Sequence, residues 1–272
     1  MNSLQHIVVH DLEISYPERS FSLTVDQLEI SKGEMTILLG STGTGKSTLL
    51  DVLGLIEKPS MSRCAISYHL NDLPPHTFQN LWSNARKRNR LKRQRFGYMF
   101  QQAFFIPDLT VRKNINVSQV LSGGVSAEKA NQQGLSKNGL FRENEQFSGH
   151  ELAWQCSGGQ QQRLALTRAL IHQPELLFLD EPTGDLDRNT AQLVFEHLKR
   201  EVFHAENANR SIVMVTHDMA LACQYGDSIY FIDKEQSRVG LHTNLRKRGG
   251  AWYYGGKAMD TEEAVSFLLT QM

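Results

Sequence analysis

The sequence predicts an α/β fold in which helices cover a mainly parallel sheet. Three apolar runs, Met35–Leu39, Leu176–Leu179 and Ile212–Val215, have the length and unbroken hydrophobicity of buried parallel strands. Helix-like segments lie at Thr48–Leu55 and Gln160–Ile171. Alternation of strands and helices favours a parallel sheet with crossover helices, and 272 residues are enough for one large domain of this kind.

The stretch from residue 6 to residue 39 reads as short strands separated by turns. Val25–Ile30 alternates apolar and polar residues, and Ser31–Glu34 interrupts the pattern before the first buried run. We therefore expect a mixed sheet near the N-terminus. Residues 58–95 are polar and weakly patterned, and they end in a basic run, Arg86–Arg95. A solvated helix face is the favoured interpretation of this run, and a membrane-surface patch is the alternative.

Composition excludes several classes of protein. Lys plus Arg and Asp plus Glu each number 29, so the formal net charge is zero and no overall bias favours nucleic acid as a partner. No apolar run approaches the roughly 18 residues that span a bilayer. Met1–His10 lacks the pattern of a signal peptide, so we expect the protein to stay inside the cell. The cysteines are scattered without CxxC spacing, which disfavours a disulfide framework or a zinc site: Cys64, Cys156 and Cys223.

The chain after Gly240 contains two glycine pairs and then a helical pattern. Asp260 is placed to cap this helix, with Glu263 three residues later. Helical spacing predicts one apolar face made of Val265, Leu268, Leu269 and Met272. Packing against the core is the favoured use of this face, and contact with a partner is the alternative.

A glycine-rich loop lies between the first buried run and a helical segment, and it matches the pattern GxxxxGK[ST] in full. Glycines let backbone N–H groups turn around phosphate oxygens, and the helix that follows points its positive end at the same anion. Lys46 would place its charge on the β and γ phosphates, and Ser47 would offer a hydroxyl to Mg²⁺. The loop therefore predicts ATP and Mg²⁺, bound by Gly40, Ser41, Thr42, Gly43, Thr44, Gly45, Lys46, Ser47 and Thr48.

The second buried run ends in two carboxylates, Asp180 and Glu181. The carboxyl ends of parallel strands are where α/β sheets bind ligands. Asp180 can hold Mg²⁺ through water, and Glu181 can polarise an attacking water. Acids often end strands for other reasons, so this pair gains its meaning from the glycine loop that accompanies it.

A further motif points to a family. Cys156–Gln160, followed by Gln161, Gln162 and Arg163, resembles the LSGGQ signature of ABC ATPases. Together with Asp180–Asp187 and Thr216–Asp218, the resemblance covers roughly residues 5 to 235. It implies a P-loop NTPase core of the RecA type with an N-terminal antiparallel β part and an inserted α-helical subdomain. The implied parts of this one ABC ATPase domain are a core of about 1–101 and 166–240, a helical subdomain of about 102–165 and a C-terminal tail of 241–272.

The resemblance also implies roles for residues outside the glycine loop. Tyr16 corresponds to an aromatic residue that stacks on adenine, with ordinary packing as the alternative. Gln101 corresponds to a glutamine that reaches Mg²⁺ and the attacking water, and Gln102 is its rival for that role. The implied Mg²⁺ ligands are Ser47, Gln101 and Asp180, and the implied catalytic residues are Glu181, His217 and Gln101.

Other implied roles cross between subunits. His217 would contact the γ-phosphate, and Asp187 would link the two nucleotide sites of a homodimer. The signature residues Ser157, Gly158, Gly159 and Gln160 would face the γ-phosphate held by the second subunit. The signature begins with Cys156 where leucine is usual. Both side chains are apolar, so we expect activity to be retained.

Within the family, Phe96–Gln102 and Glu181–Gly184 resemble the group that serves lipoprotein release, macrolide export and cell division. Residues 60–95 and 122–155 fit the family pattern loosely. Relatives in this group work with separate membrane subunits. The resemblance therefore implies an integral membrane permease as a partner, and a cytoplasmic location at the inner face of the cell membrane.

The segment Ala103–Pro107, directly after Gln101, contains three large apolar residues that a soluble monomer would bury or avoid. We expect one or two of them to line a groove for a short permease helix, with burial of all three as the alternative. One rival function is a soluble ABC protein acting on a non-transport partner such as DNA or the ribosome. It is disfavoured because the chain has no long coiled coil and no second cassette. The other rival, a scaffold that binds ATP without hydrolysis, is disfavoured by the intact Lys46, Glu181 and His217.

Overall fold

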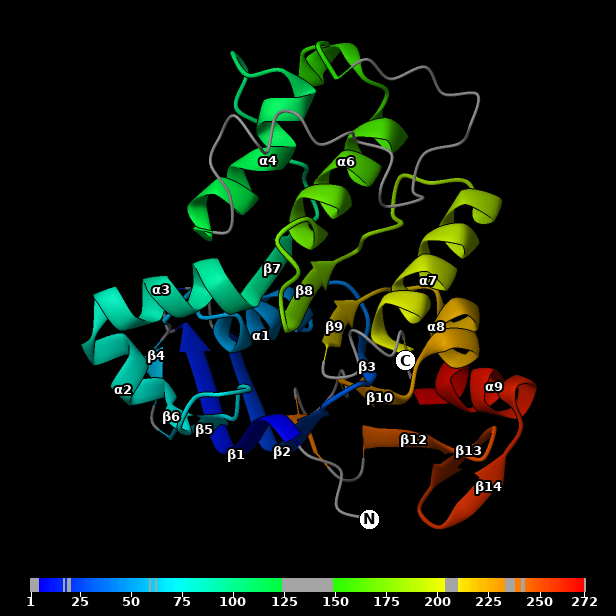
Figure 1. The fold of residues 1–272 in the computed structure, drawn as a ribbon. Helices are drawn as coiled ribbons and strands as arrows, with labels where there is room; N and C mark the ends of the chain where they lie inside the picture. Colours follow the sequence, from blue (N-terminus) through cyan, green and yellow to red (C-terminus); the bar gives the residue numbers. More distant parts are fainter. Residues whose placement is uncertain are drawn as a thin grey trace.

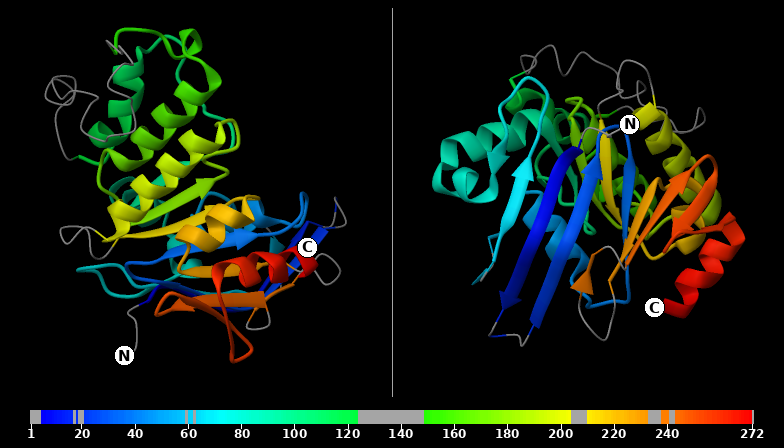
Figure 2. Two further views of the ribbon diagram at one scale, coloured as in Figure 1. Left: turned by 90° about the vertical axis from the view of Figure 1, so that its right-hand side faces the viewer. Right: turned by 90° about the horizontal axis from the view of Figure 1, so that it is seen from below.

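Two sheets with helices packed around them form the described part of the chain (Figure 1). The computed structural model describes residues 5–16, 18, 21–58, 60–61, 63–123, 149–203, 210–232, 238–240 and 243–271. Helices α4 (Val111–Leu121) and α6 (Gly158–Leu170), in green, stand at the top of Figure 2 (left). The C-terminal strands and helix α9 (Thr261–Gln271), in orange and red, lie at the bottom.

The larger sheet runs in the order β14-β13-β12-β10-β3-β9-β8-β7 among the described residues. Its neighbouring strands pair in parallel from β10 to β7. These strands are β3 (Met35–Leu39), β7 (Phe96–Met99), β8 (Leu176–Asp180), β9 (Ser211–Val215) and β10 (Ser228–Phe231). Every residue of β3, β8, β9 and β10 is buried, which explains why all but one residue of each strand is apolar. The predicted α/β class is confirmed.

The smaller sheet forms the predicted N-terminal β part, but its first two strands are 12 and 11 residues long, so the expectation of short strands was wrong. Strands β1 (Gln5–Tyr16) and β2 (Phe21–Ser31) pair antiparallel, and Tyr16 lies opposite Phe21. Strand β11 (Arg238–Val239) pairs in parallel with β2, so the sheet is mixed. The remaining strands of this sheet are β4 (Ser60–Met61), β5 (Ala65–Tyr68) and β6 (His76–Thr77).

Two apolar layers hold the sheets and helices together, and β3 shows how one strand contributes to both. Leu38 packs in the layer shared with the N-terminal sheet and helix α1 (Lys46–Leu53). Ile37 and Leu39 point to the opposite face, where α6, α7 (Arg188–Phe203), α8 (Met219–Tyr225) and α9 supply the partners. This alternation fixes the edge at which β3 delivers the loop that follows it.

The predicted helical segment of about 102–165 is described at its two ends. Helix α4, the 3₁₀ turn η3 (Ala153–Gln155) and α6 pack around a small cluster of Val111, Ile115, Cys156 and Leu164. Helix α6 continues to Leu170 and enters the main core. The division of the domain stays a prediction, and most of residues 122–155 lie outside the described residues.

Residues 58–95 fold regularly in spite of their weak pattern. Helix α2 (Phe78–Ser83) buries Phe78 and Leu81, and α3 (Ala85–Arg95) buries Leu91. A few anchors of this kind suffice for short helices that lie on a larger core. The basic run is thus a helix, and most of its residues are exposed.

The C-terminal part extends the larger sheet. Strands β12 (Asn244–Arg248), β13 (Ala251–Tyr254) and β14 (Lys257–Met259) are antiparallel. The predicted cap of α9 is present: Glu263 N–H donates to Asp260 Oδ1 at 2.8 Å, and Asp260 N–H donates to Glu263 Oε2 at 3.0 Å.

The predicted apolar face of α9 is wrong in part. Val265 and Leu268 pack on the core, but Leu269 is 62% exposed. Ala264 and Phe267 take its place, because residue 269 lies about 100° further around the helix than residue 268. Met272 lies outside the described residues. None of the described helices is long and apolar enough to cross a membrane.

Candidate functional site

The glycine loop connects the carboxyl end of β3 to α1, as the motif requires. Gly43 and Gly45 have φ values of 83° and 95°, a region that side chains other than glycine rarely adopt. At Gly45 an added Cβ would also lie 2.5 Å from Phe21 Cζ. The loop therefore needs glycine at residue 45 for two separate reasons, backbone conformation and space.

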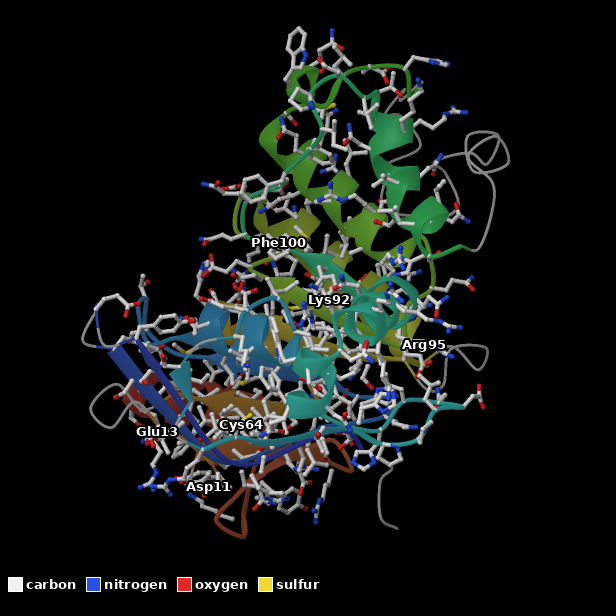
Figure 3. The ribbon with its side chains drawn as sticks, turned by 90° about the vertical axis from the view of Figure 1, so that its left-hand side faces the viewer. Asp11, Glu13, Cys64, Lys92, Arg95 and Phe100 are labelled. Atoms are coloured by element: carbon white, nitrogen blue, oxygen red, sulfur yellow. The ribbon has the colours of Figure 1, made fainter. Side chains whose placement is uncertain are left out.

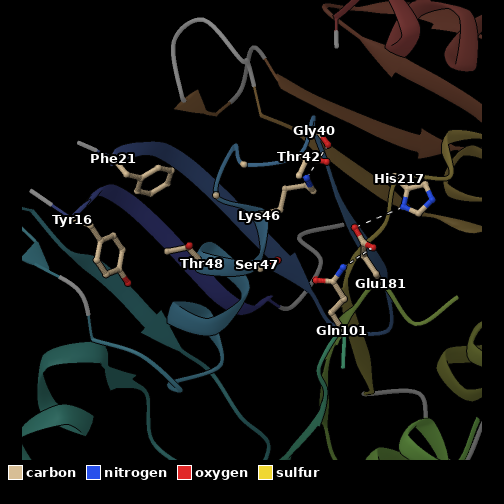
Figure 4. Close-up of a pocket in the computed structure, with 12 residues that line it drawn as sticks. Tyr16, Phe21, Gly40, Thr42, Lys46, Ser47, Thr48, Gln101, Glu181 and His217 are labelled. Atoms are coloured by element: carbon tan, nitrogen blue, oxygen red, sulfur yellow. Dashed lines mark hydrogen bonds and ion pairs between the residues drawn. The ribbon is translucent and has the colours of Figure 1, made fainter. Parts of the chain in front are cut away.

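The loop borders a hollow of about 750 Å³ (Figure 4). The residues that line it come from β1, β2, the loop, α1 and the ends of β7, β8 and β9: Tyr16, Phe21, Gly40, Thr42, Gly43, Gly45, Lys46, Ser47, Thr48, Gln101, Glu181 and His217. Of the predicted nucleotide-binding residues, Ser41 and Thr44 are not among them. Thr44 is buried, and its hydroxyl donates to the Ser41 carbonyl at 2.9 Å, so it supports the loop from behind.

Lys46 lies at the base of the hollow and is 7% exposed. Its ammonium donates to the carbonyls of Gly40 and Ser41, each at 2.8 Å. Burial lowers the pKa of Lys46 below its ordinary value, and the carboxylates of Glu181 and Asp180 oppose that shift. A phosphate would offer this cation stronger acceptors than two neutral carbonyls.

Asp180 ends β8 close to Ser47, and the Ser47 side chain hydrogen-bonds to its carboxylate. Asp180 Oδ1 is buried and has no hydrogen-bond partner among the described residues. Burial raises the pKa of Asp180, the Ser47 hydrogen bond lowers it, and the neighbouring Glu181 raises it further. An unpartnered carboxylate oxygen beside a hydroxyl suits Mg²⁺, which takes few protein ligands when a phosphate supplies others. The described residues contain no larger cluster of His, Cys, Asp or Glu for a metal.

Glu181 is the meeting point of three strand ends. Gln101 Nε2, after β7, donates to Glu181 Oε2 at 3.3 Å, and His217 Nδ1, after β9, lies 3.7 Å from Glu181 Oε1 (Figure 4). Glu181 has φ 47°, an uncommon conformation for a residue with a side chain. Its N–H donates to the Val215 carbonyl at 2.9 Å, which holds this turn in place. Gln102 does not line the hollow, whereas its rival Gln101 does.

Tyr16 and Phe21 form the aromatic end of the hollow. They lie opposite each other in the β1–β2 pair, and their ring centroids are 6.1 Å apart. Phe21 was missed by the sequence analysis. The signal that could have found it is its place at the start of an alternating strand, across a short turn from Tyr16, because a hairpin brings such positions together.

The signature residues lie at the start of α6 and do not line the hollow. Gln160 N–H donates to Ser157 Oγ at 3.3 Å, and Ser157 N–H donates to Gln160 Oε1 at 2.8 Å, which is a capping box. Ser157 and Gly158 are exposed. Cys156 is buried among apolar residues of α4 and α6, as an apolar replacement for leucine should be.

Asp187 lies between Glu181 and α7, in the loop that follows β8. Its Oδ1 accepts from the N–H groups of Asn189 and Thr190, each at 3.1 Å, and its Oδ2 accepts from the Thr190 hydroxyl at 2.6 Å. Asp187 therefore caps the first turn of α7. Both carboxylate oxygens of Asp187 are thus hydrogen-bonded, although the residue is exposed at the surface.

Comparison with known proteins places this geometry in a family. The profile of the ABC transporter family matches residues 23–184, which include the glycine loop, the signature and the carboxylates at the end of β8. The chain belongs to the ABC transporter family. It is an ATP-binding subunit of this family and an ATPase.

Several relatives are similar over most of the chain. An uncharacterised ABC transporter ATP-binding protein of Methanocaldococcus jannaschii, MJ0796, is 32% identical over 78% of this chain and 85% of its own length. The lipoprotein-releasing system ATP-binding protein LolD 1 of Caulobacter vibrioides is 34% identical, over 82% of this chain and 87% of the relative. The macrolide export ATP-binding/permease protein MacB of Vibrio parahaemolyticus is 36% identical, over 79% of this chain but only 31% of MacB.

Solved structures agree with this placement. A dimeric structure of MJ0796 superposes with a TM-score of 0.71 at 28% identity, covering 89% of this chain and 99% of MJ0796. A second dimeric structure of MJ0796 is of a post-hydrolysis state bound to ADP and phosphate, with the same TM-score at 27% identity. The suspected group of lipoprotein-release and macrolide-export ATPases is confirmed by these relatives.

Proposed function

We propose that this ATPase binds Mg-ATP, closes into a homodimer and drives a separate membrane permease. The observation that carries the proposal is the position of the signature. The predicted catalytic residues Glu181, Gln101 and His217 line one hollow with Lys46, whereas none of the signature residues Ser157–Gln160 lines it. A second copy of the chain would bring these residues to the nucleotide.

The residues of the hollow suit distinct steps of hydrolysis. Lys46 would exchange its loop carbonyls for the β and γ phosphates of ATP. Glu181 would polarise the attacking water, while Gln101 and His217, already in contact with it, would hold that water and the γ-phosphate in line. Tyr16 would stack on adenine.

Ser47, Asp180 and Gln101 are the residues that would hold Mg²⁺. When bound, the ion would neutralise charge that develops on the phosphates. The unpartnered Asp180 Oδ1 and the adjoining Ser47 hydroxyl support the assignment of these two residues.

The homodimer follows from the exposed start of α6. Ser157 Oγ, the N–H groups of Gly158 and Gly159 and the helix dipole together suit an anion. In the proposed dimer they meet the γ-phosphate on the partner's glycine loop, and Asp187 lies between the two sites. The dimeric structures of MJ0796 support this arrangement.

The permease would dock beside Gln101. Phe104 is 65% exposed and Ile106 is 48% exposed, so two of the three apolar residues predicted for docking are available. Phe105 instead packs against the core and lies under the Arg168 guanidinium, 5.0 Å from its ring centroid. Phe105 is therefore structural, and we assign docking to Phe104.

A groove of about 320 Å³ adjoins this segment through Arg168. Its floor is aromatic and its upper wall is formed by α4; its lining includes Phe96, Tyr98, Phe100, Val117, Leu121, Lys92 and Arg93. Phe100 lines the groove and directly precedes Gln101. A movement of Gln101 with the γ-phosphate would therefore move Phe100 and change the shape of the groove. Docking there would hold the subunit at the inner face of the membrane.

The test co-expresses this chain with the permease of the proposed complex. Phe104→Ala should lower co-purification with the permease at least tenfold, since aromatic anchors carry about 2 kcal/mol or more of an interface. ATP binding by the isolated chain should be unchanged. Leu193→Ala, on α7 and 50% exposed, is the matched control and should have no effect. Wild-type co-purification of Phe104→Ala, or no stimulation of wild-type turnover by the permease, would contradict the proposal.

A further inference from the structure

Helix α3 concentrates positive charge in a chain whose formal net charge is zero. Its eleven residues contain seven cations and no carboxylate: Arg86, Lys87, Arg88, Arg90, Lys92, Arg93 and Arg95. Like charges four residues apart, such as Arg86 and Arg90, destabilise a helix. A helix face that is only solvated is more stable when positive and negative side chains alternate on it. A helix with positive charges alone therefore indicates an anionic binding partner.

Three of these cations turn inward and have partners within the protein. Arg95 forms an ion pair with Glu175, and the Arg88 guanidinium lies 4.0 Å from the Trp82 ring centroid. Lys92 lies 5.7 Å from the Tyr98 ring centroid and close to Asp51. Figure 3 shows Lys92 between Phe100 and Arg95 on the side of the molecule that carries α3.

The remaining four cations, which include Lys87, are exposed and face outward. Arg86, Arg90 and Arg93 follow the i, i+4, i+7 spacing of one helix face, over about 10 Å, and all three are exposed. None of them forms an ion pair with a carboxylate in the described part of the chain. Intrahelical hydrogen bonds hold two of them along the helix, from Arg90 Nε to Gln94 Oε1 at 3.2 Å and from Arg93 Nε to the Asn89 carbonyl at 3.3 Å.

These side chains border an open hollow of about 650 Å³. Its lining among the described residues is entirely polar: Arg86, Asn89, Arg90, Lys92 and Arg93. No apolar anchor point is present, whereas stable protein interfaces are built around buried aromatic or aliphatic anchors. A cationic hollow without an anchor suits the headgroups of a lipid surface, whose phosphates match the planar fork of arginine.

We propose that the outward face of α3 binds anionic lipid headgroups, which adds a membrane contact to the one made through the permease. Lys92 and Arg93 line both this hollow and the aromatic groove in which the permease is placed. The two surfaces are thus continuous, and a permease docked in the groove would turn α3 toward the bilayer. Only this orientation rests on the proposed function; lipid binding by α3 requires no permease.

The experiment measures sedimentation of the full chain with vesicles. One set is phosphatidylcholine with about 30% phosphatidylglycerol, and the other is phosphatidylcholine alone. The chain should bind the anionic set in about 0.1 M salt and lose binding in about 0.5 M salt, because screening shortens the reach of the charges. R86E/R90E should weaken vesicle binding at least about 25-fold, because each lost cation costs about fivefold and each added carboxylate is repelled by the anionic lipid.

The matched control is R248E/K257E, which makes the same change in total charge at two exposed residues of the C-terminal strands. It should keep vesicle binding. Equal loss in both double variants, equal binding to neutral vesicles, or full binding by R86E/R90E would overturn the proposal. A further pair of results would also overturn the proposal: the wild-type chain does not bind vesicles, and R86E/R90E no longer co-purifies with the permease in detergent. That pair would assign the outward face of α3 to an acidic protein segment. If the chain binds anionic vesicles but no permease stimulates its hydrolysis, lipid binding by α3 is upheld and the proposed function fails.

Discussion

The predicted nucleotide-binding residues of this chain lie in two regions, a hollow lined by the glycine loop and the exposed N-terminus of α6. The glycine loop and the ends of β7, β8 and β9 form a hollow whose polar groups contact one another: Lys46 on loop carbonyls, Ser47 on Asp180, and Gln101 on Glu181. At the start of α6, Ser157 and Gly158 are exposed, and none of Ser157–Gln160 lines the hollow.

This difference shows what one chain can and cannot complete. The hollow is preorganised because parallel strands deliver its residues to one edge of a rigid sheet. The N-terminus of α6 directs its helix dipole and its N–H groups at solvent, and water and salt screen the charge of such an exposed site. The first region should therefore tolerate isolation as a monomer, and the second should matter only when two subunits meet. The predictions below test that division.

The largest effect is expected within the hollow. Glu181→Gln should reduce hydrolysis about 10²–10⁴-fold, because the amide keeps the shape of the side chain but does not accept a proton as a carboxylate does. ATP should stay bound, and sedimentation with ATP should show more dimer than wild type. Turnover at the wild-type rate would remove Glu181 from the catalytic role.

A smaller but still large effect is expected at the exposed helix end. Ser157→Arg should lower hydrolysis about 100-fold by obstructing closure, while the monomer still binds ATP in isothermal titration. Mixing it with Lys46→Ala subunits should restore part of the activity, since one composite site then lacks both defects. Loss of ATP binding by the Ser157→Arg monomer would show that the signature acts within its own subunit.

Phe21 sharpens the comparison on the adenine side of the hollow. Phe21→Ala should raise the Kd for ATP about fivefold, at the lower end of what one aromatic–base stack contributes. Tyr16→Ala is the parallel variant, and triphosphate alone should bind both variants as it binds wild type. Equal ATP affinity of Phe21→Ala and wild type would assign Phe21 to packing against Gly45 alone.

The smallest effect separates a structural cap from a functional one. Asp260 and Ser157 both cap helices through a reciprocal capping box. Asp260→Ala should cost about 1 kcal/mol of unfolding free energy in denaturant titration, with hydrolysis unchanged. Ser157→Ala should cost a similar amount and also slow hydrolysis. Equal hydrolysis by the two variants would mean that Ser157 is only a cap.

Local sequence alone determined the three buried strands β3, β8 and β9, the glycine loop and the family. Four of the five residues of Met35–Leu39 are apolar, which favours a buried strand. The loop that follows contains glycines at positions with positive φ, where other residues are strained. The cap at Asp260 was equally readable, since a capping box involves only residues three apart.

Only the tertiary structure decided which residues share a surface. The contact of Gln101 and His217 with Glu181 depends on the order of β7, β8 and β9 in the sheet, which no local pattern encodes. Phe21 joins Tyr16 through strand register. Phe105 is half-buried and lies under the Arg168 guanidinium of α6, whereas Phe104 is exposed. For the basic run, the sequence left a solvated face and a membrane-surface patch open, and only the fold separates its inward cations from Arg86, Arg90 and Arg93. Each of these outcomes is a relation between segments distant in sequence, so it is fixed by packing and pairing rather than by the residues' own preferences.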